Sequence, residues 1–384
     1  MTAALIILSV LALLALIVVL FDAVPLFLNW EERIGIGRMS GEAWLGAVKN
    51  TALKWLKKTP SVPITDNTRL TLIDRLRGNY RSDKIQSWQE AFLLLGLNEC
   101  GNDEGTKKEI KEYVDRVLSE SADKLPMSVD FALKAYAVLT SPLCDREKMR
   151  PLFDSVFDFL KKSAGDGTVP YNVNIPNVRF VDAVGMVCPF LFEYAAVYGS
   201  DEASALALRQ IDEYVKYGLH SCLYVPVHCF NTANKAPLGV YGWGRGCGWF
   251  AFALYASLGS TAGETKAHIS EIAEKFADGM IKYQLPSGGW GRMIFSDSVG
   301  ESSATAMTAC LMNGLFLESG DEKYKNSFDK AISFLQKSTR RNGKVDFAQG
   351  DTKGIGFYSS RLGVLPAAQG ASLVAACKAH TNKK

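Results

Sequence analysis

Helical patterns of two kinds alternate along the chain, and this alternation most constrains the fold. Residues 179–198 are apolar on nearly every face, whereas residues 202–218 carry Arg209 and Asp212 opposite an apolar face. A helix that is apolar all round is buried among other helices, and a helix with one apolar face lies at the surface. The patterns predict helices over 84–98, 106–120, 128–140, 147–163, 179–198, 202–218, 246–258, 265–283, 302–318, 322–337 and 366–379.

The helices of the buried kind recur at a nearly fixed interval of about 50 to 65 residues, which is the mark of a repeat architecture. Residues near their starts are Asp130, Asp182, Gly246, Ser303 and Gln369. One further helix from the 41–80 region completes six helical hairpins. We therefore expect an all-α fold, an (α/α)6 barrel, in which six hairpins close into a ring.

The N-terminus carries an uncharged apolar run over residues 3–21. At about 1.5 Å per residue this run is long enough to cross most of a hydrocarbon core of about 30 Å, so it predicts a transmembrane helix. A cleaved signal peptide is the competing interpretation, but no Lys or Arg precedes the run and no small-x-small cleavage site follows it. Basic residues follow the run only, which by the positive-inside rule places the barrel on the cytoplasmic side of the inner membrane; they are Arg33, Arg38, Lys49, Lys54, Lys57 and Lys58.

Residues 42–58 form an amphipathic pattern with Trp44 and Trp55 on its apolar stripe. This helix either lies on an anionic membrane surface or is the first helix of the barrel. Thr59 to Pro63 resemble a linker. We expect a transmembrane anchor over 1–22, a juxtamembrane helix and linker over 23–80, and the barrel over 81–384.

Composition excludes several classes of protein. The net charge of +3 over 384 residues, without a basic block interleaved with aromatic residues, argues against nucleic-acid binding. The eight cysteines are scattered and form no CxxC pair, which favours free thiols in a reducing compartment. We expect no metal and no cofactor, since no cluster of His and carboxylate residues has the spacing of metal ligands.

Polar chemistry concentrates in long loops that precede the buried helices and should share one rim. These loops are rich in glycine and aromatic residues, and long ordered loops on a helical scaffold are usually functional; they span 166–172, 237–249, 286–303 and 341–358. The quartet Gly-Trp-Gly-Arg occurs at 242–245 and again at 289–292. Flat faces from Trp243 and Trp249 with the forked cation of Arg245 suit a sugar acid, although a packed aromatic turn would have the same residues.

Three segments resemble the unsaturated glucuronyl and rhamnogalacturonyl hydrolases of glycoside hydrolase families 88 and 105. Residues 180–191, FVDAVGMVCPFL, are similar to the segment in which the catalytic Asp of these families opens an inner helix. Residues 241–249 resemble their W-x-R-G-N-G-W signature, and residues 301–307, ESSATAM, resemble E-T-S-A-T-A-M. A weaker similarity links the chain to membrane-anchored proteins of bacterial exopolysaccharide assembly.

The resemblance implies hydration of a vinyl ether in a terminal unsaturated uronic acid. Asp182 would be the general acid and base, and Asp130 a second carboxylate. For each Asp the alternative role is a helix N-cap. Arg245 would hold the uronate carboxylate with two parallel hydrogen bonds. The remaining residues expected to contact the substrate are His228, Trp243, Trp249, Trp290 and Ser303.

Cys247 departs from the resemblance, because it stands where the signature has an Asn. The alternative function is a saccharide-binding accessory component of exopolysaccharide or capsule biosynthesis without this hydrolase activity, working with polysaccharide-assembly proteins. A sugar epimerase on the same barrel would need two opposed His bases, and the chain has only four His. The preferred function is therefore a membrane-anchored hydrolase of uronic acid oligosaccharides or polysaccharides.

Overall fold

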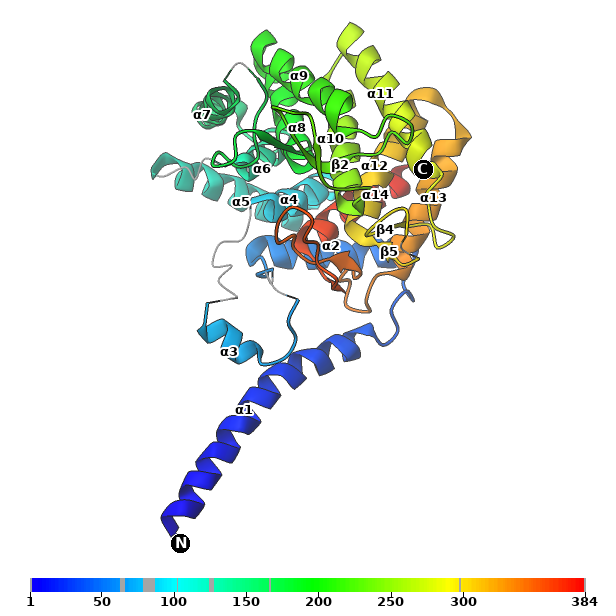
Figure 1. Ribbon diagram of the computed structural model, residues 1–384. Coiled ribbons are helices and arrows are strands. Elements are labelled where there is room, and N and C mark those ends of the chain that lie inside the picture. The colour runs from blue at the N-terminus through cyan, green and yellow to red at the C-terminus, as the bar shows by residue number, and fades with distance from the viewer. Residues whose placement is uncertain are drawn as a thin grey trace.

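The computed structural model describes residues 2–62, 66–78, 87–101, 103–123, 128–165, 167–296 and 298–382. Asp166 of the first expected loop and Pro63 of the expected linker lie outside these residues. Within them, two rings of helices form the body of the protein, and a long helix, α1, extends from it (Figure 1).

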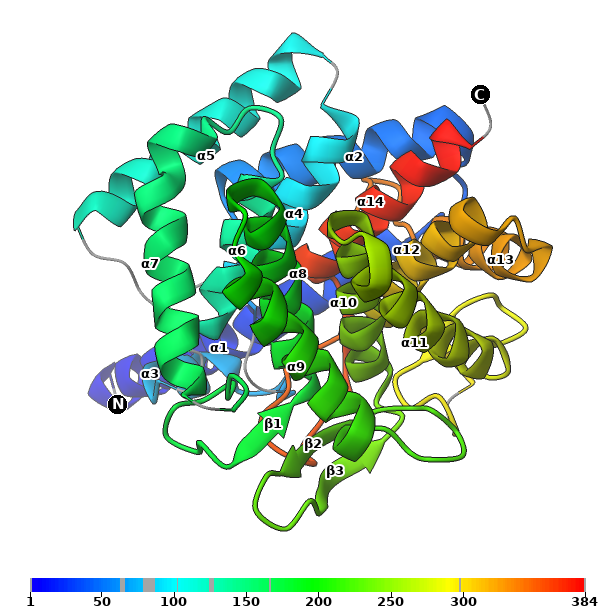
Figure 2. The ribbon, with the colours of Figure 1, turned by 90° about the horizontal axis from the view of Figure 1, so that it is seen from above.

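The inner ring consists of the helices that the sequence marks as apolar all round. Each packs against the next, and the last packs against the first, so that the ring is closed (Figure 2). Its members are α4 (Ser87–Cys100), α6 (Val129–Leu139), α8 (Val181–Tyr198), α10 (Gly244–Ser260), α12 (Ser302–Ser319) and α14 (Pro366–Thr381).

The outer ring covers these helices and pairs with them into six hairpins, which confirms the (α/α)6 barrel. Its members are α2 (Gly41–Lys57), α5 (Glu104–Asp123), α7 (Arg146–Ala164), α9 (Asp201–Gly218), α11 (Gly263–Ile281) and α13 (Glu322–Lys337). In α13, Tyr324, Phe328 and Leu335 are buried at helical spacing. Burying each such side chain contributes about 1.5 to 3 kcal/mol.

The helix ends follow the local sequence. The side chain of Ser200 accepts a hydrogen bond from the backbone N–H of Ala203 at the start of α9, and Asp321 caps α13 in the same way. Gly199 and Gly320 end α8 and α12 in the left-handed conformation, with φ of +70° at both. These breaks explain why the sequence predicts the helix boundaries closely.

The expected amphipathic helix at 42–58 is α2, and its apolar stripe is buried. Trp44, Val48, Ala52 and Trp55 are at most 6% exposed. They pack against α4 and α14. Of the two interpretations of this segment, the structure shows the barrel helix, and the division of the chain into domains stays a prediction.

Short antiparallel strands join the loops at one end of the inner helices. The first sheet has the order β1-β2-β3, built from β1 (Val178–Phe180), β2 (Val227–Asn231) and β3 (Pro237–Tyr241). The other two sheets each have two strands: β4 (Trp290–Gly291) with β5 (Gly300–Glu301), and β6 (Ala348–Gln349) with β7 (Leu362–Gly363). All of these strands lie in the segments that lead into the N-terminal ends of inner helices. The long loops therefore share one rim of the barrel.

Helix α1 (Thr2–Arg33) is long and apolar enough to cross a membrane. Its last turn is attached to the barrel: Arg33 donates to Asp346 at 2.6 Å, and Glu32 accepts from Arg340 and Lys344 at 2.6 Å each. Burial works to raise the pKa of Asp346, but hydrogen bonds from Arg33 and Arg340 outweigh it and hold this pKa below its usual value. Helix α8 also has the length and hydropathy of a span, but it is a mostly buried inner helix of the barrel.

A short helix, α3 (Thr71–Leu76), lies beside α1. The carboxylate of Asp22 accepts hydrogen bonds from the backbone N–H groups of Leu70 and Thr71, at 2.5 and 2.9 Å, and from the Thr71 hydroxyl. The charge that ends the apolar run thus caps a neighbouring helix.

The cysteines are not all free thiols. Cys100 and Cys377 form a disulfide between the ends of α4 and α14, with Cα atoms 6.2 Å apart. The expectation of scattered thiols is wrong for this pair, because neighbouring inner helices bring together two residues that are 277 positions apart in sequence.

Candidate active site

A cavity of about 360 Å³ opens at the loop-bearing rim, at the N-terminal ends of α4, α8 and α10. The loop that follows β6 forms its other wall. Its lining is aromatic and acidic: Trp88, Tyr171, Asn172, Ile175, Phe180, Asp182, Met186, His228, Arg245, Trp249, Asp351, Thr352, Lys353, Gly354 and Ile355. Of the eight residues expected from the sequence to act on substrate, four line this cavity: Asp182, His228, Arg245 and Trp249.

Asp182 is the second residue of α8, and its side chain is 17% exposed. Its Oδ2 atom is buried and has no hydrogen-bond partner among the described residues. The residue at the N-cap of α8 is Phe180, and no side chain caps this helix, so Asp182 does not serve as the expected N-cap alternative. Burial raises the pKa of Asp182 to about 7; Arg245 pulls this pKa down, and Asp130 and Asp351 push it further up.

His228 lies on β2 and faces Asp182, with Nε2 3.7 Å from Oδ2. Its Nδ1 is 3.1 Å from the hydroxyl of Tyr358. Burial lowers the pKa of His228 to about 4, and the nearby Arg245 lowers it further. The imidazole is therefore neutral at pH 7, where Asp182 is partly protonated.

Asp130 occupies the same position in α6 that Asp182 occupies in α8, the second residue of the helix. Ser128 is its N-cap residue, and no side chain caps α6. Burial raises the pKa of Asp130 to about 6; a hydrogen bond with Tyr171 opposes the rise, and Asp351 adds to it. Asp130 does not itself line the cavity, but Tyr171, its hydrogen-bond partner, does.

Arg245 lies in the first turn of α10 and is 2% exposed. Its guanidinium donates to the carbonyl oxygens of Gln349 and Gly350, at 2.6 and 2.9 Å, and to the Thr352 hydroxyl at 3.1 Å. Both terminal nitrogens are thus committed to the loop that walls the cavity. Arg245 holds this loop, and a bidentate clamp on a substrate carboxylate would require it to release these partners.

The tryptophans divide into two kinds. Trp249 lines the cavity and packs edge-on against Trp88, with ring centroids 5.5 Å apart. Trp243 is 1% exposed, donates its indole N–H to Gln349 at 2.8 Å and packs at a tilt against His228, with ring centroids 4.7 Å apart. Trp243 therefore supports the cavity wall from behind and does not line it.

Trp290 and Ser303 also lie outside the cavity lining. The indole N–H of Trp290 donates to the carbonyl of Met280 at 2.8 Å, and this side chain is fully buried. The hydroxyl of Ser303 donates to Glu301, a carboxylate that caps α12 and also accepts from the backbone N–H of Gln349 at 2.8 Å. Both residues shape the rim, and the structure gives neither a face toward substrate.

The two Gly-Trp-Gly-Arg quartets are neighbours in space. The backbone of Trp243 pairs with that of Met293, and the N–H of Gly244 donates to the carbonyl of Arg292 at 2.6 Å. A Cβ atom at position 244 would lie 2.1 Å from the carbonyl oxygen of Gly291, so only glycine allows this approach. The repeated quartet is a packing device of the rim.

Cys247, which stands in place of the Asn of the signature, is fully buried and does not line the cavity. Burial raises the pKa of its thiol, which is therefore neutral. The replacement of the signature's Asn by Cys247 therefore lies in the buried part of α10 and does not change the cavity lining.

The loop after β6 supplies residues that the sequence does not single out: Asp351, Lys353 and Tyr358. Its C-terminal end is tied to the segment between α2 and α3, because Asp66 accepts from the Ser359 hydroxyl at 2.6 Å and from the Ser360 backbone N–H at 2.8 Å. Lys353 lies 3.4 Å from the same carboxylate. In the sequence, only the length and composition of the 341–358 loop pointed to these residues as part of the site.

No group of three or more His, Cys, Asp or Glu side chains in the described part of the chain could hold a metal ion. The cavity offers a carboxyl whose pKa lies near neutrality, Asp182, beside a neutral imidazole, and Asp130 is linked to it through Tyr171. Such a carboxyl under aromatic walls at the rim of an (α/α)6 barrel is an arrangement that suits acid and base chemistry on a saccharide.

The family model of Glycosyl Hydrolase Family 88 matches residues 55–382, and the chain belongs to this family. It is therefore a glycoside hydrolase, and its substrate is a saccharide. The resemblance noted in the sequence is confirmed. No curated protein is similar enough in sequence to count as a match.

Solved structures share the fold at low sequence identity. A possible member of the GH105 family from Klebsiella pneumoniae superposes with a TM-score of 0.75 at 16% identity, covering 90% of this chain and 95% of that one. A similar protein from Salmonella enterica gives 0.74 at 14% identity, covering 88% and 94%. The unsaturated glucuronyl hydrolase of Bacillus sp. GL1 gives 0.64 at 15% identity, covering 92% and 97%.

Proposed function

We propose that this glycoside hydrolase removes a terminal unsaturated uronic acid from a saccharide by hydrating its vinyl ether. The observation that carries the proposal is the state of Asp182, a buried carboxyl at the cavity whose Oδ2 has no hydrogen-bond partner among the described residues and whose pKa is about 7. Such a carboxyl can both give and take a proton at neutral pH.

The proposed reaction uses one carboxyl for two proton transfers. Asp182 transfers its proton to C4 of the C4=C5 double bond, and positive charge develops at C5. The resulting carboxylate takes a proton from a water molecule as the water oxygen bonds to C5. This second transfer regenerates protonated Asp182. The hemiketal so formed opens to a ketone at C5 as its hydroxyl proton moves to the ring oxygen. The hemiacetal left at C1 then breaks its bond to the aglycone, which takes the hemiacetal proton and leaves as an alcohol.

The neighbours of Asp182 set its state. Asp130 and Asp351 disfavour a further negative charge near it, whereas Arg245 stabilises the carboxylate after proton transfer. Nε2 of His228 lies 3.7 Å from Oδ2 of Asp182. Because the ring is neutral, it forms no ion pair with Asp182 and is free to contact a bound sugar or water. Trp88 and Trp249 supply apolar walls for the sugar ring.

The substrate carboxylate needs a cation that is less firmly held than Arg245. Lys353 lines the cavity, and its side chain is 39% exposed. Its ion-pair partner, Asp66, is 3.4 Å away and also accepts hydrogen bonds from Ser359 and Ser360. We propose that Lys353, with Arg245 behind the loop, provides the positive field that favours an acidic sugar.

The test is to incubate the full chain in detergent with unsaturated uronyl disaccharides and to follow the loss of their ultraviolet absorbance. The saturated disaccharides serve as matched controls. Turnover of the unsaturated sugar alone supports vinyl-ether hydration. Equal turnover of both would indicate ordinary glycoside cleavage, and binding without turnover would leave the accessory role in polysaccharide biosynthesis, which no comparison supports.

We also propose that α1 anchors the enzyme in a membrane. Its side chains are exposed along the apolar run, and its last turn is built into the barrel through Arg33 and Glu32, so the anchor and the enzyme form one unit. The distribution of basic residues supports a barrel on the cytoplasmic side. The disulfide between Cys100 and Cys377 opposes this orientation, since such bonds persist in oxidising compartments.

A further inference from the structure

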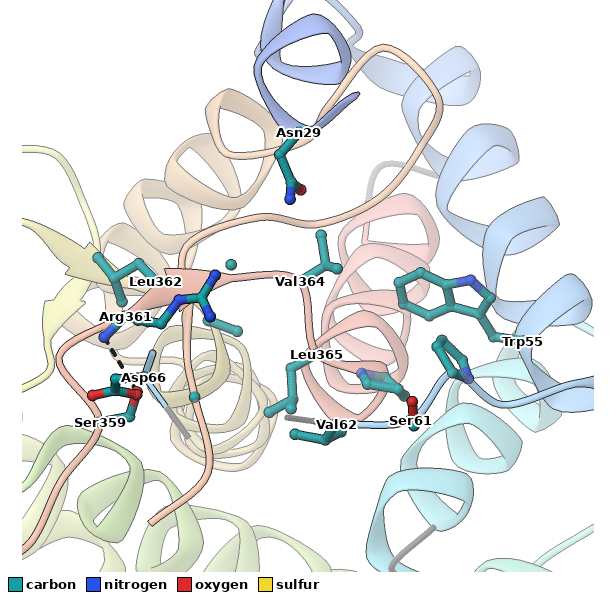
Figure 3. A pocket seen from close by; sticks show the side chains of 15 residues that line it. Asn29, Trp55, Ser61, Val62, Asp66, Ser359, Arg361, Leu362, Val364 and Leu365 are labelled. Atoms are coloured by element: carbon teal, nitrogen blue, oxygen red, sulfur yellow. Dashed lines mark hydrogen bonds between the residues drawn. The ribbon is translucent and has the colours of Figure 1, made fainter. Parts of the chain in front are cut away.

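A second cavity, of about 260 Å³, lies where the end of α1 meets the barrel (Figure 3). The segment 359–366, around β7, separates it from the loop that walls the candidate active site. One side of this cavity is apolar and consists of Trp55, Pro60, Val62, Val364, Leu365 and Pro366. Neither the proposed reaction nor the family assignment uses it.

Two hydrogen-bond donors face the cavity from opposite elements (Figure 3). Arg361 is half-buried, and its guanidinium has no hydrogen-bond or ion-pair partner within the described part of the chain. Asn29 of α1 accepts a hydrogen bond from Arg340 through Oδ1, at 3.0 Å, which leaves its NH2 group as the polar atom that points inward. A half-buried cation without a partner next to an oriented amide donor is a site for an anion.

The cavity also contains a carboxylate, that of Asp66. Its oxygens already accept from the Ser359 hydroxyl and from the backbone N–H and hydroxyl of Ser360, and Lys353 lies 3.4 Å away. Hydrogen bonds and Lys353 hold the pKa of Asp66 below its usual value although burial opposes them. The negative charge of Asp66 is thus stabilised by the loop, and Arg361 is the cation left for a ligand.

The position of the cavity indicates the source of the anion. Beyond Asp22 the exposed apolar surface of α1 continues over residues 23–28, with Pro25 inside the helix, so Asn29 is the first polar residue after it, about 1.5 Å beyond Leu28. The polar headgroup layer adds about 5 to 7 Å on each side of a hydrocarbon core of about 30 Å. Phe27 and Trp30, 60% and 61% exposed, flank Asn29 with the aromatic rings that favour this layer.

We infer that this cavity binds the headgroup phosphate of an anionic phospholipid, with Arg361 and Asn29 as donors and the apolar side receiving the start of an acyl chain. The inference rests on the proposed membrane anchor, because α1 must bring the cavity to the level of the headgroups. An acidic oligosaccharide or a free phosphate would also meet Arg361, but neither would use the apolar wall.

The experiment is native mass spectrometry of the full chain in detergent micelles with added phosphatidylglycerol or phosphatidylcholine. We expect one phosphatidylglycerol per chain to be retained in preference to phosphatidylcholine. Arg361→Gln should weaken its retention about tenfold or more, the loss expected for a hydrogen bond to a charged group. The backbone N–H and carbonyl of residue 361, which bond Ser359 and Gly350, are unchanged by this substitution.

Two further variants make the test specific. Arg38→Gln removes a charge of the same sign from the exposed surface just after α1 and should leave lipid retention within about twofold of the parent, since an exposed charge contributes little. Asn29→Asp keeps an acceptor for Arg340 while placing a negative charge at the site, and it should lower retention of phosphatidylglycerol as Arg361→Gln does.

Equal loss of phosphatidylglycerol retention in Arg38→Gln and Arg361→Gln would show that general surface charge holds the lipid, and it would overturn the inference. Equal retention of both lipids would also overturn it. Inorganic phosphate or an unsaturated uronyl oligosaccharide that displaces the lipid at equal concentration would show a free anion or a sugar as the occupant. Failure of the anchor is seen separately, because the chain would then leave the membrane fraction without detergent.

Discussion

Asp182 and His228 lie 3.7 Å apart, and their pKa values move in the directions opposite to those of an ion pair. In an ion pair the carboxyl pKa falls and the imidazole pKa rises. Here burial raises the first to about 7 and lowers the second to about 4. At neutral pH the pair is therefore a carboxyl that exchanges its proton beside a neutral ring, and the pH dependence of the enzyme should reflect the carboxyls.

The pH profile of turnover should have two limbs near neutrality. Activity should fall as the pH rises above about 7, because Asp182 must carry the proton that it donates. It should also fall below about 6, where protonation of Asp130 removes the neighbouring charge that makes the Asp182 carboxylate a stronger base toward water. Because these groups interact, the two values belong to the pair. Measurement of kcat over about pH 4 to 9 checks this, and His228→Ala should keep both limbs, because His228 is already neutral over this range above about pH 4.

Asp182→Asn should abolish turnover and leave the fold intact, since the amide neither donates nor accepts the catalytic proton and Asp182 does not cap α8. The sign of the stability change follows from the raised pKa. The folded state binds the proton more tightly than the unfolded state, so the cost of the buried charge grows as the pH rises from about 4 to about 7. The melting temperature of the variant should therefore exceed that of the parent more at alkaline pH than at acidic pH. Residual parental activity would refute the assignment.

Arg245→Lys should lower the melting temperature and weaken acidic and neutral ligands alike, because a point cation cannot replace the hydrogen bonds to Gln349, Gly350 and Thr352. We expect a loss of about 1 to 3 kcal/mol in the free energy of unfolding. Calorimetry with a uronate and a neutral saccharide measures both effects. Loss of the acidic ligand alone, at an unchanged melting temperature, would restore Arg245 as the clamp expected from the sequence.

Asp66→Ala should raise KM for the unsaturated substrate more than it lowers kcat, because Asp66 holds Lys353 and the C-terminal end of the loop that carries it. The pH limbs should stay in place, since Asp130 and Asp182 are untouched. Asp329→Ala on α13, which removes an exposed carboxylate paired with Lys325, is the matched control and should behave as the parent. A change of the same size in both variants would show that Asp66 has no particular link to the cavity.

The orientation of the barrel can be read from a fusion at the C-terminus. From the basic residues after the apolar run we expect a phosphatase reporter to be inactive and a cytoplasmic fluorescent reporter to be bright. Thiol labelling of Cys100 and Cys377 in intact cells is the second readout, since a cytoplasmic barrel should expose them to reduction. An active phosphatase with both cysteines protected would place the barrel outside the cytoplasm.

The sequence predicts the barrel well because its evidence is local. Helical periodicity separates the all-apolar α8 from the two-faced α9, and caps such as Ser200 and Gly199 mark where one ends and the next begins. Asp182 was found through the segment it shares with the family. These features need no knowledge of distant contacts.

The rest of the site depends on contacts between residues far apart in sequence. A tryptophan in a glycine-rich loop has the same pattern whether it faces a sugar, as Trp249 can, or supports a wall, as Trp243 and Trp290 do. The role of Arg245 was likewise decided by carbonyl groups about a hundred residues later in the chain. Lys353 reaches the cavity, and Tyr358 reaches His228, because Asp66 and Arg245 hold their loop over the site.

The closure of the inner ring also bears on the order in which the protein can fold. Helices α4 and α14 cross so closely that a Cβ atom on Gly370 would lie 2.1 Å from the carbonyl group of Phe92. The ribosome delivers α4 early and α14 last, so the apolar face of α4 lacks its neighbour for most of synthesis. Long-range contacts of this kind are slow to form and leave apolar surface open to aggregation. Loss of the last helix would therefore trap an unfinished, association-prone chain rather than yield a slightly smaller enzyme.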